Sequence, residues 1–195
     1  MQNVSAVLYL SPNMETILIT GFEPFGGRKI NASWEIVSGL PDEICGYKVE
    51  KLLVPVEFGT GASVILEKVR ELHPAFLFMH GEAGGRTKVT PETKAVNIRK
   101  EAGKVRQDGP DEIMNSILVK KIVSSMKDYP IEASDDAGTY VCNDVFYSAL
   151  YELAGSDTVV SFTHVPYIED DVKPVLALET ALETVLQYIR QTVSQ

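Results

Sequence analysis

The chain has few of the residues on which the most easily identified sites depend: its 195 residues include two cysteines, three histidines and one tryptophan. The two cysteines form no CxxC pair, so a zinc site is not expected. The net charge of −9 and the lack of any Lys/Arg run argue against DNA or RNA as a partner. No stretch reaches the roughly 18 apolar residues that a membrane span needs. Nucleic acid, membrane and metal are therefore not expected as partners.

The first 13 residues, "MQNVSAVLYLSPN", lack a basic segment before their short apolar run. This makes them a poor signal peptide. A second methionine, Met14, directly precedes "ETILITGF", so residues 1–13 are expected to be a disordered extension or an upstream start. Without an export signal the expected compartment is the cytoplasm, where thiols stay reduced. A disulfide between Cys45 and Cys142 is therefore not expected, and Cys45 has no predicted chemistry.

Length and composition favour one domain over residues 1–195, since 45% of the residues are hydrophobic and such a chain can bury a sizeable core. Short apolar runs alternate with segments of helical period, which is typical of an α/β sandwich. The pattern predicts strands near 15–22, 47–56, 75–79, 94–98 and 158–165, and helices near 31–40, 61–73, 114–126, from 141 onward and 174–193.

Four segments follow predicted strands or precede a predicted helix: "GFEPFGG", "HGEAGGRTKVTPE", "AGTYVCN" and "THVPY". Sites in open α/β sheets form beyond the carboxyl ends of the strands, where these segments should meet. The glycine turn fits neither a P-loop nor GxGxxG. Its Phe22, Pro24 and Phe25 suit either a packed tight turn or the apolar wall of a pocket for a neutral ligand.

Cys142 lies where a helix is predicted to begin near Val141, with Thr139 as a candidate N-cap. Unpaired amides and the helix dipole at such a position favour an anion, which predicts a lowered thiol pKa and a possible nucleophile. The same amides would stabilise an oxyanion. A buried, inert cysteine is the commoner alternative.

A cysteine nucleophile needs a histidine base and a group that orients it. His80 and His164 both stand at strand ends, and their spacing does not distinguish them. Glu82 and Glu92 are both acidic residues near the same expected rim. From the residues alone, both choices stay open.

Taken together and in order, "ILITGFEPFGG", "AGGRTKVTPE…AVNI", "AGTYVCN" and "FTHVPY" resemble the pyroglutamyl peptidase I family of cytosolic cysteine peptidases, over about residues 16–167. The resemblance implies removal of an N-terminal pyroglutamyl residue from peptides, with no metal or organic cofactor. It also implies a three-layer α/β/α sandwich with a twisted, mostly parallel sheet, and assembly into homo-oligomers that are commonly tetramers.

The resemblance also assigns roles to residues. It implies Cys142 as the nucleophile, His164 rather than His80 as the general base, and Glu92 rather than Glu82 as the acidic third member. Cys142 would attack the pyroglutamyl carbonyl, His164 would protonate the leaving amine, and water would release pyroglutamate. The residues that the resemblance places at the substrate are Phe22, Phe25, Asn31, Glu82, Tyr140 and Val141.

The chain departs from the family pattern in two places. Glu82 stands where members usually carry glutamine, which removes an amide donor. A family segment similar to "DARIPDN" is replaced by "RKEAGKVRQDG", and Lys104 or Arg106 is the candidate to replace an arginine near the substrate. Two alternatives to a pyroglutamyl peptidase follow: a cysteine amidase with another small acyl preference, and a catalytically silent binding protein.

Overall fold

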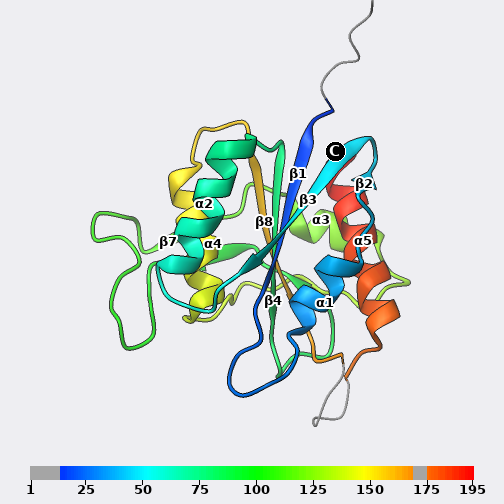
Figure 1. Ribbon diagram of the computed structural model, residues 1–195, viewed down its shortest axis with the longest axis horizontal. Coiled ribbons are helices and arrows are strands. Elements are labelled where there is room, and N and C mark those ends of the chain that lie inside the picture. The colour runs from blue at the N-terminus through cyan, green and yellow to red at the C-terminus, as the bar shows by residue number, and fades with distance from the viewer. Residues whose placement is uncertain (1–13, 169–174) are drawn as a thin grey trace, which may run out of the picture.

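The computed structural model describes residues 14–168 and 175–195 (Figure 1). The extension expected at residues 1–13 lies outside this part of the chain. The organisation of residues 1–195 as one domain stays a prediction. Within the described ranges, no helix is long and apolar enough to cross a membrane.

A six-stranded sheet forms the centre of the fold, in the order β2-β3-β1-β4-β8-β5. Its four middle strands are parallel and its two short edge strands run antiparallel. The strands are β1 (Thr16–Phe22), β2 (Glu43–Ile44), β3 (Tyr47–Val54), β4 (Phe76–Glu82), β5 (Thr90–Pro91) and β8 (Val159–Val165). A separate two-stranded ribbon pairs β6 (Lys94–Val96) with β7 (Glu112–Met114).

Helices cover both faces of this sheet (Figure 1). One face is covered by α2 (Thr60–Leu72) and α4 (Val141–Glu152), and the other by α1 (Ala32–Gly39), α3 (Val119–Ser125) and α5 (Leu178–Val193). The prediction of a three-layer α/β/α sandwich with a mostly parallel sheet is therefore confirmed. A sheet covered on both faces needs apolar side chains on both, which explains why the β1 sequence "TILITGF" is a continuous apolar run rather than an alternating one.

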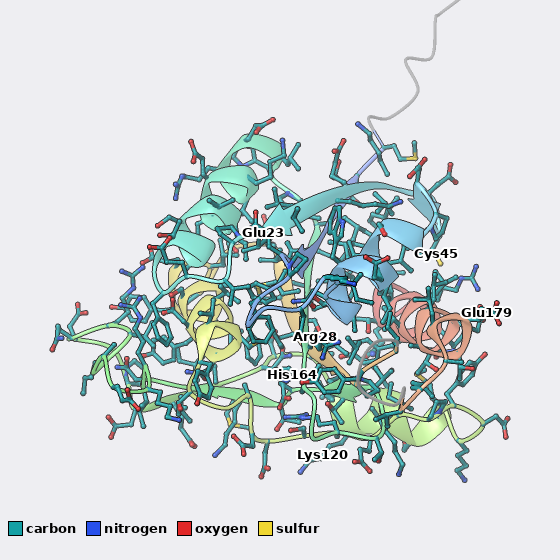
Figure 2. All side chains as sticks on the ribbon, turned by 60° about the horizontal axis from the view of Figure 1, so that its bottom comes forward. Glu23, Arg28, Cys45, Lys120, His164 and Glu179 are labelled. Carbon is teal, nitrogen blue, oxygen red and sulfur yellow. The ribbon has the colours of Figure 1, made fainter. Side chains whose placement is uncertain are left out.

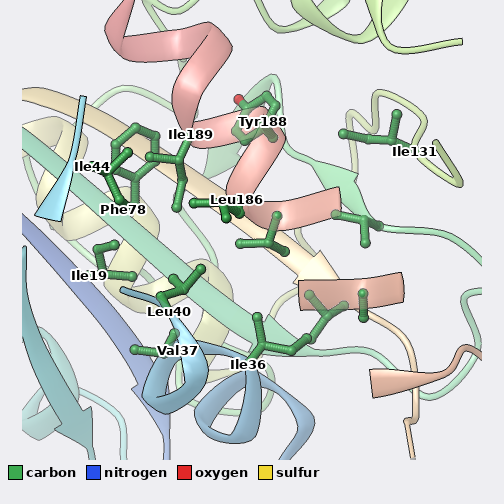
Figure 3. Close-up of a cluster of buried hydrophobic side chains, with 14 of the residues drawn as sticks. Ile19, Ile36, Val37, Leu40, Ile44, Phe78, Ile131, Leu186, Tyr188 and Ile189 are labelled. Atoms are coloured by element: carbon green, nitrogen blue, oxygen red, sulfur yellow. The ribbon is translucent and has the colours of Figure 1, made fainter. Parts of the chain in front are cut away.

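The side chains of β1 divide between two cores. Ile17 and Ile19 face the core under α1 and α5, whereas Leu18 faces the core under α2 and α4, and all three are fully buried. The first core includes Phe78 and Tyr188 (Figure 3). Each fully buried side chain of this size contributes about 1.5–3 kcal/mol relative to exposure. The two cores hold the sheet between the helices and so fix the position of its carboxyl edge.

The prediction of a helix over residues 114–126 is wrong in its first part. Residues Glu112–Met114 form β7, and the helix begins only at Val119. The Asn115 side chain accepts a hydrogen bond from the Ile117 amide at 3.0 Å. A side chain that satisfies a nearby amide in this way competes with the helix and favours a turn. The apolar spacing in this segment therefore spans a strand, a turn and a helix.

His80 on β4 is fully buried beside Phe78, on the α1 and α5 face of the sheet. Burial lowers the pKa of His80 from 6.5 to about 4. Because the unfolded chain binds the proton more tightly, the stabilising contribution of neutral His80 is complete above about pH 6.5. It is lost as the pH falls toward 4, by up to about 3 kcal/mol.

We therefore expect the free energy of unfolding, measured with urea, to fall between pH 7 and pH 5 more steeply in the natural protein than in a His80→Gln variant. The comparison cancels the contribution of other titrating groups, His164 included. Equal pH slopes for the two proteins would contradict the burial of a neutral His80.

Candidate active site

A cavity of about 760 Å³ opens at the carboxyl edge of the sheet, where the turn after β1, the ends of β4 and β8 and the start of α4 meet. All the predicted site residues except Glu92 line it. The remaining wall comes from the loop after β3, the "AGGR" turn and the segment before α4. The lining residues are Phe22, Phe25, Asn31, Val56, Glu57, Phe58, Glu82, Ala83, Arg86, Asp136, Ala137, Gly138, Tyr140, Val141, Cys142 and His164.

Cys142 is half-buried in the first turn of α4, as the sequence predicted. Its sulfur lies against the backbone of β4, since a Cβ added to Gly81 would stand 2.7 Å from Cys142 Sγ. Gly81 pairs with His164 across the β4–β8 ladder. A glycine at this point of β4 therefore lets the thiol approach the strand that neighbours the histidine.

His164 is held by a buried carboxylate. Its Nδ1 lies 2.7 Å from Glu92 Oε1, and Glu92 is fully buried behind the cavity. The antiparallel strand β5 delivers this contact, because Thr90 pairs with His164 and the Glu92 amide donates to the Phe162 carbonyl at 2.9 Å. With Nδ1–H donated to the carboxylate, Nε2 is left as the proton acceptor. This is the arrangement that a general base requires.

Arg86, which the sequence did not single out, neutralises this carboxylate. Its Nη1 lies 2.7 Å from Glu92 Oε1, and Nη2 donates to the Asp136 carbonyl. Burial lowers the pKa of His164, while the hydrogen bond and charge of Glu92 oppose that shift. His164 is therefore neutral near pH 7. The signal for Arg86 was present in "AGGR", but no spacing rule connects it with Glu92.

The expectation of a lowered thiol pKa is wrong. Burial raises the pKa of Cys142 to about 12, and the negative charge of Glu92 adds to that shift. Desolvation of the thiolate thus outweighs the helix terminus that was expected to stabilise it. The thiol is protonated before substrate binds, so His164 must remove its proton during attack.

The start of α4 has backbone amides available for a substrate oxygen. The N-cap is Tyr140 rather than the expected Thr139, and the Tyr140 side chain makes no capping hydrogen bond. The first amides of a helix have no acceptor within the helix itself. Those next to Cys142 can therefore donate to an oxyanion that forms beside its sulfur.

Two buried polar residues after Cys142 fix the first turn of α4. Asn143 exchanges hydrogen bonds with the Val96 amide and carbonyl at 2.9 and 2.8 Å. The two carboxylate oxygens of Asp144 lie 2.7 Å from Arg99 Nε and 2.7 Å from the Gly59 amide. The loop after Ile98 is thus attached to the helix that carries Cys142.

We expect Arg99→Ala to lower the free energy of unfolding by about 1–3 kcal/mol, because it leaves the buried Asp144 carboxylate without its cation. Urea unfolding would measure the loss. Lys104→Ala is the matched control from the same loop, since Lys104 pairs with the exposed Asp111 at 3.6 Å and should change stability by less than about 0.5 kcal/mol. Equal losses in both variants would contradict a special role for the Arg99–Asp144 pair.

Neither cation that was expected to replace the substrate-binding arginine reaches the cavity. Lys104 pairs with Asp111, and Arg106 pairs with Glu152. The cation that does line the cavity is Arg86. Sequence order misplaced this function because Lys104 and Arg106 are engaged in these two ion pairs. The start of "RKEAGKVRQDG" does reach the cavity wall, where Lys100 Nζ donates to the Tyr140 hydroxyl.

Asn31 lines the cavity, but the oxygen and the nitrogen of its side chain already form hydrogen bonds within the chain. Its oxygen caps α1 by accepting from the Ser33 amide at 3.0 Å, and its nitrogen donates to the Glu23 carbonyl at 3.0 Å. Asn31 therefore holds the glycine turn, with Phe22 and Phe25, at the start of α1. Asn31 is therefore the N-cap of α1 and has a positioning function.

A half-buried thiol, an imidazole and a buried carboxylate around one aromatic cavity in an α/β/α fold define a cysteine hydrolase. Comparison with known proteins agrees: the pyroglutamyl peptidase family model matches residues 15–195. Pyrrolidone-carboxylate peptidase of Thermococcus onnurineus is 37% identical, over 86% of this chain and 93% of that protein. The enzyme of Lactobacillus helveticus is 36% identical, over 80% and 86%.

Solved structures give the same result. Pyroglutamyl peptidase I of Bacillus amyloliquefaciens superposes with a TM-score of 0.84 at 28% identity, covering 93% of this chain and 98% of that one. Pyrrolidone carboxyl peptidase of Thermococcus litoralis gives 0.83 at 26% identity, covering 93% and 94%. The chain belongs to the pyroglutamyl peptidase family, cysteine peptidases that remove pyroglutamyl residues.

Proposed function

We propose that this chain removes the N-terminal pyroglutamyl residue from peptides through a thioester on Cys142, with His164 as general acid and base and Glu92 as its orienting carboxylate. The observation that carries the proposal is the 2.7 Å contact between His164 Nδ1 and Glu92 Oε1, at a cavity that also contains the Cys142 thiol.

The mechanism follows from the protonation states. His164 Nε2 accepts the thiol proton as the sulfur of Cys142 attacks the pyroglutamyl carbonyl carbon, and the amides at the start of α4 donate to the oxygen that becomes negative. The imidazolium, stabilised by Glu92, then gives the proton to the leaving amine, and the C–N bond breaks. Water attacks the thioester with His164 again accepting a proton, and pyroglutamate leaves as the thiol is restored.

The cavity wall suits the acyl group of this substrate. Pyroglutamate is a flat, uncharged lactam, so it needs apolar faces and a few polar groups rather than a charged clamp. Phe22 and Phe25 supply aromatic surface on one side, while Tyr140 and Val141 flank the nucleophile. The cavity volume of about 760 Å³ also leaves room for the first residues of the leaving peptide.

The remaining parts of the proposal concern the setting of the enzyme. We include a cytoplasmic location, because Cys45 and Cys142 are both free thiols and the mechanism needs a reduced Cys142. A homo-oligomer of tetramer size and catalysis without metal or organic cofactor are part of the same proposal, and the chemistry above requires neither metal nor cofactor.

Hydrolysis of pyroglutamyl, alanyl and prolyl aminomethylcoumarin amides, with and without prior alkylation by iodoacetamide, tests the proposal. Turnover of the pyroglutamyl amide that alkylation abolishes supports it. Preference for another amide would instead favour the cysteine amidase, and lack of all turnover would favour the silent binding protein. Either result would overturn the proposed activity.

A further inference from the structure

Glu82, at the end of β4, places a carboxylate in the wall of an otherwise aromatic cavity. Its side chain is almost completely buried, and Oε2 accepts a hydrogen bond from the Ala32 amide at the start of α1 at 2.8 Å. Oε1 lies 3.4 Å from Arg28 Nη1. The glycine turn, which supplies the aromatic wall, therefore also supplies the cation beside this carboxylate.

Arg28 is also held in place by Tyr167. The Arg28 guanidinium stands 3.9 Å from the centroid of the Tyr167 ring. Tyr167 itself lies against Gly84, where an added Cβ would stand 2.3 Å from the ring. In the view of Figure 2, Arg28 and His164 are labelled near one another at the centre of the molecule. Because the cation is stacked on a packed ring, its charge is fixed beside Glu82.

The charge balance at Glu82 decides which ring the cavity favours. A pyroglutamyl ring and a prolyl ring have the same size, but the ring nitrogen of an N-terminal prolyl residue is a cation at neutral pH. A carboxylate beside aromatic faces attracts such a cation, and burial strengthens that attraction. A carboxylate already compensated by a fixed guanidinium does so much less.

We propose that Arg28 is a specificity-determining residue, whose charge compensates Glu82 so that the acyl pocket accepts an uncharged lactam ring and discriminates against a cationic prolyl ring. The inference rests on the proposed function, since it takes the same cavity as the acyl pocket. Discrimination here comes from weakening the attraction of Glu82 for the cationic ring as much as from contacts to the lactam ring.

The test compares two rings that have no bond to hydrolyse: 2-pyrrolidone, which is neutral, and pyrrolidine, which is a cation at pH 7. Each is titrated as a protectant of Cys142 against iodoacetamide, and the ratio of the two dissociation constants is the result. We expect Arg28→Gln to shift this ratio toward pyrrolidine by at least about tenfold. The ratio of kcat/KM for pyroglutamyl and prolyl amides should shift in the same direction.

Two further variants make the test specific. Lys29→Gln removes the same charge from the exposed neighbouring position and should leave the ratio within a factor of about two. Adding Glu82→Gln to Arg28→Gln should return the ratio to within about threefold of the natural protein, because the carboxylate that Arg28 compensates is then removed as well. Thermal unfolding of each variant shows that the comparison is made on folded protein.

The outcomes separate the two proposals. An unchanged ring ratio in Arg28→Gln, an equal shift in Lys29→Gln, no return in the double variant, or no protection by either ring in any protein would each overturn the role of Arg28. The protection assay needs no turnover, so absent hydrolysis together with the expected ring ratios would reject the proposed activity alone.

Discussion

Replacing Cys142 with serine is expected to lower kcat for a pyroglutamyl amide by at least about a thousandfold. The serine hydroxyl gives up its proton much less readily than a thiol, and burial lowers the pKa of the proposed base, His164. The raised thiol pKa of about 12 shows that even the natural nucleophile depends on that base. The loss should appear in kcat, because the ring-binding wall is unchanged.

Cys45→Ser is the matched control for this variant. Cys45 is exposed in the turn between β2 and β3, with φ of 51°, and it is not among the residues that line the cavity. Its replacement should leave kcat within a factor of about two. Turnover of Cys142→Ser near the natural rate, or an equal loss in Cys45→Ser, would refute Cys142 as the nucleophile.

The parts of the fold that the sequence predicted are those with a strong local period. β1 is a continuous apolar run and α5 has a clear amphipathic pattern, so each is determined by its own residues. The segment 114–126 misled the prediction because its apolar spacing is also compatible with a strand followed by a turn. The deciding contact is the pairing of Lys94 with Met114, which joins residues that are distant along the chain.

Local sequence patterns do not distinguish His80 from His164 as the base. Both stand near the ends of adjacent parallel strands, but His80 pairs with Thr163, whereas His164 pairs with Gly81. Because successive side chains of a strand alternate between faces, this register places the two histidines on opposite sides of the sheet. Only the side of His164 carries α4 and Cys142. Motif resemblance supplied this choice, and the register explains it.

The charge pairs of the site were the least predictable part. Arg86 meets Glu92 six residues away around a turn, and Arg28 meets Glu82 across the carboxyl edge of the sheet. Neither pair has helical or strand spacing, so no periodic rule joins its members. The first pair depends on the path of the loop after β4, and the second on how the loop after β1 packs against the end of β4, and neither is determined by a local pattern.

Glu92→Gln is expected to lower kcat for a pyroglutamyl amide by about a thousandfold, which is less than the roughly 10⁴-fold loss expected where the amide also imposes the wrong histidine tautomer. The glutamine oxygen can still accept from His164 Nδ1 and from Arg86, so the tautomer is kept. What is lost is the negative charge that stabilises the imidazolium, which then forms beside an uncompensated Arg86. The loss should therefore fall on the chemical step rather than on binding of the ring.

The pH profile distinguishes this role from a structural one. The hydrogen bond and charge of Glu92 raise the pKa of His164 against the effect of burial. Removing that charge lowers the pKa of His164 further, so the acid limb of kcat/KM should move to lower pH in Glu92→Gln. The lowered kcat of this variant should accompany the shift. Glu132→Gln, a surface carboxylate paired with Lys88 at 3.0 Å, should change neither rate nor profile. An acid limb that stays in place, or moves to higher pH, would show that Glu92 does not act through His164.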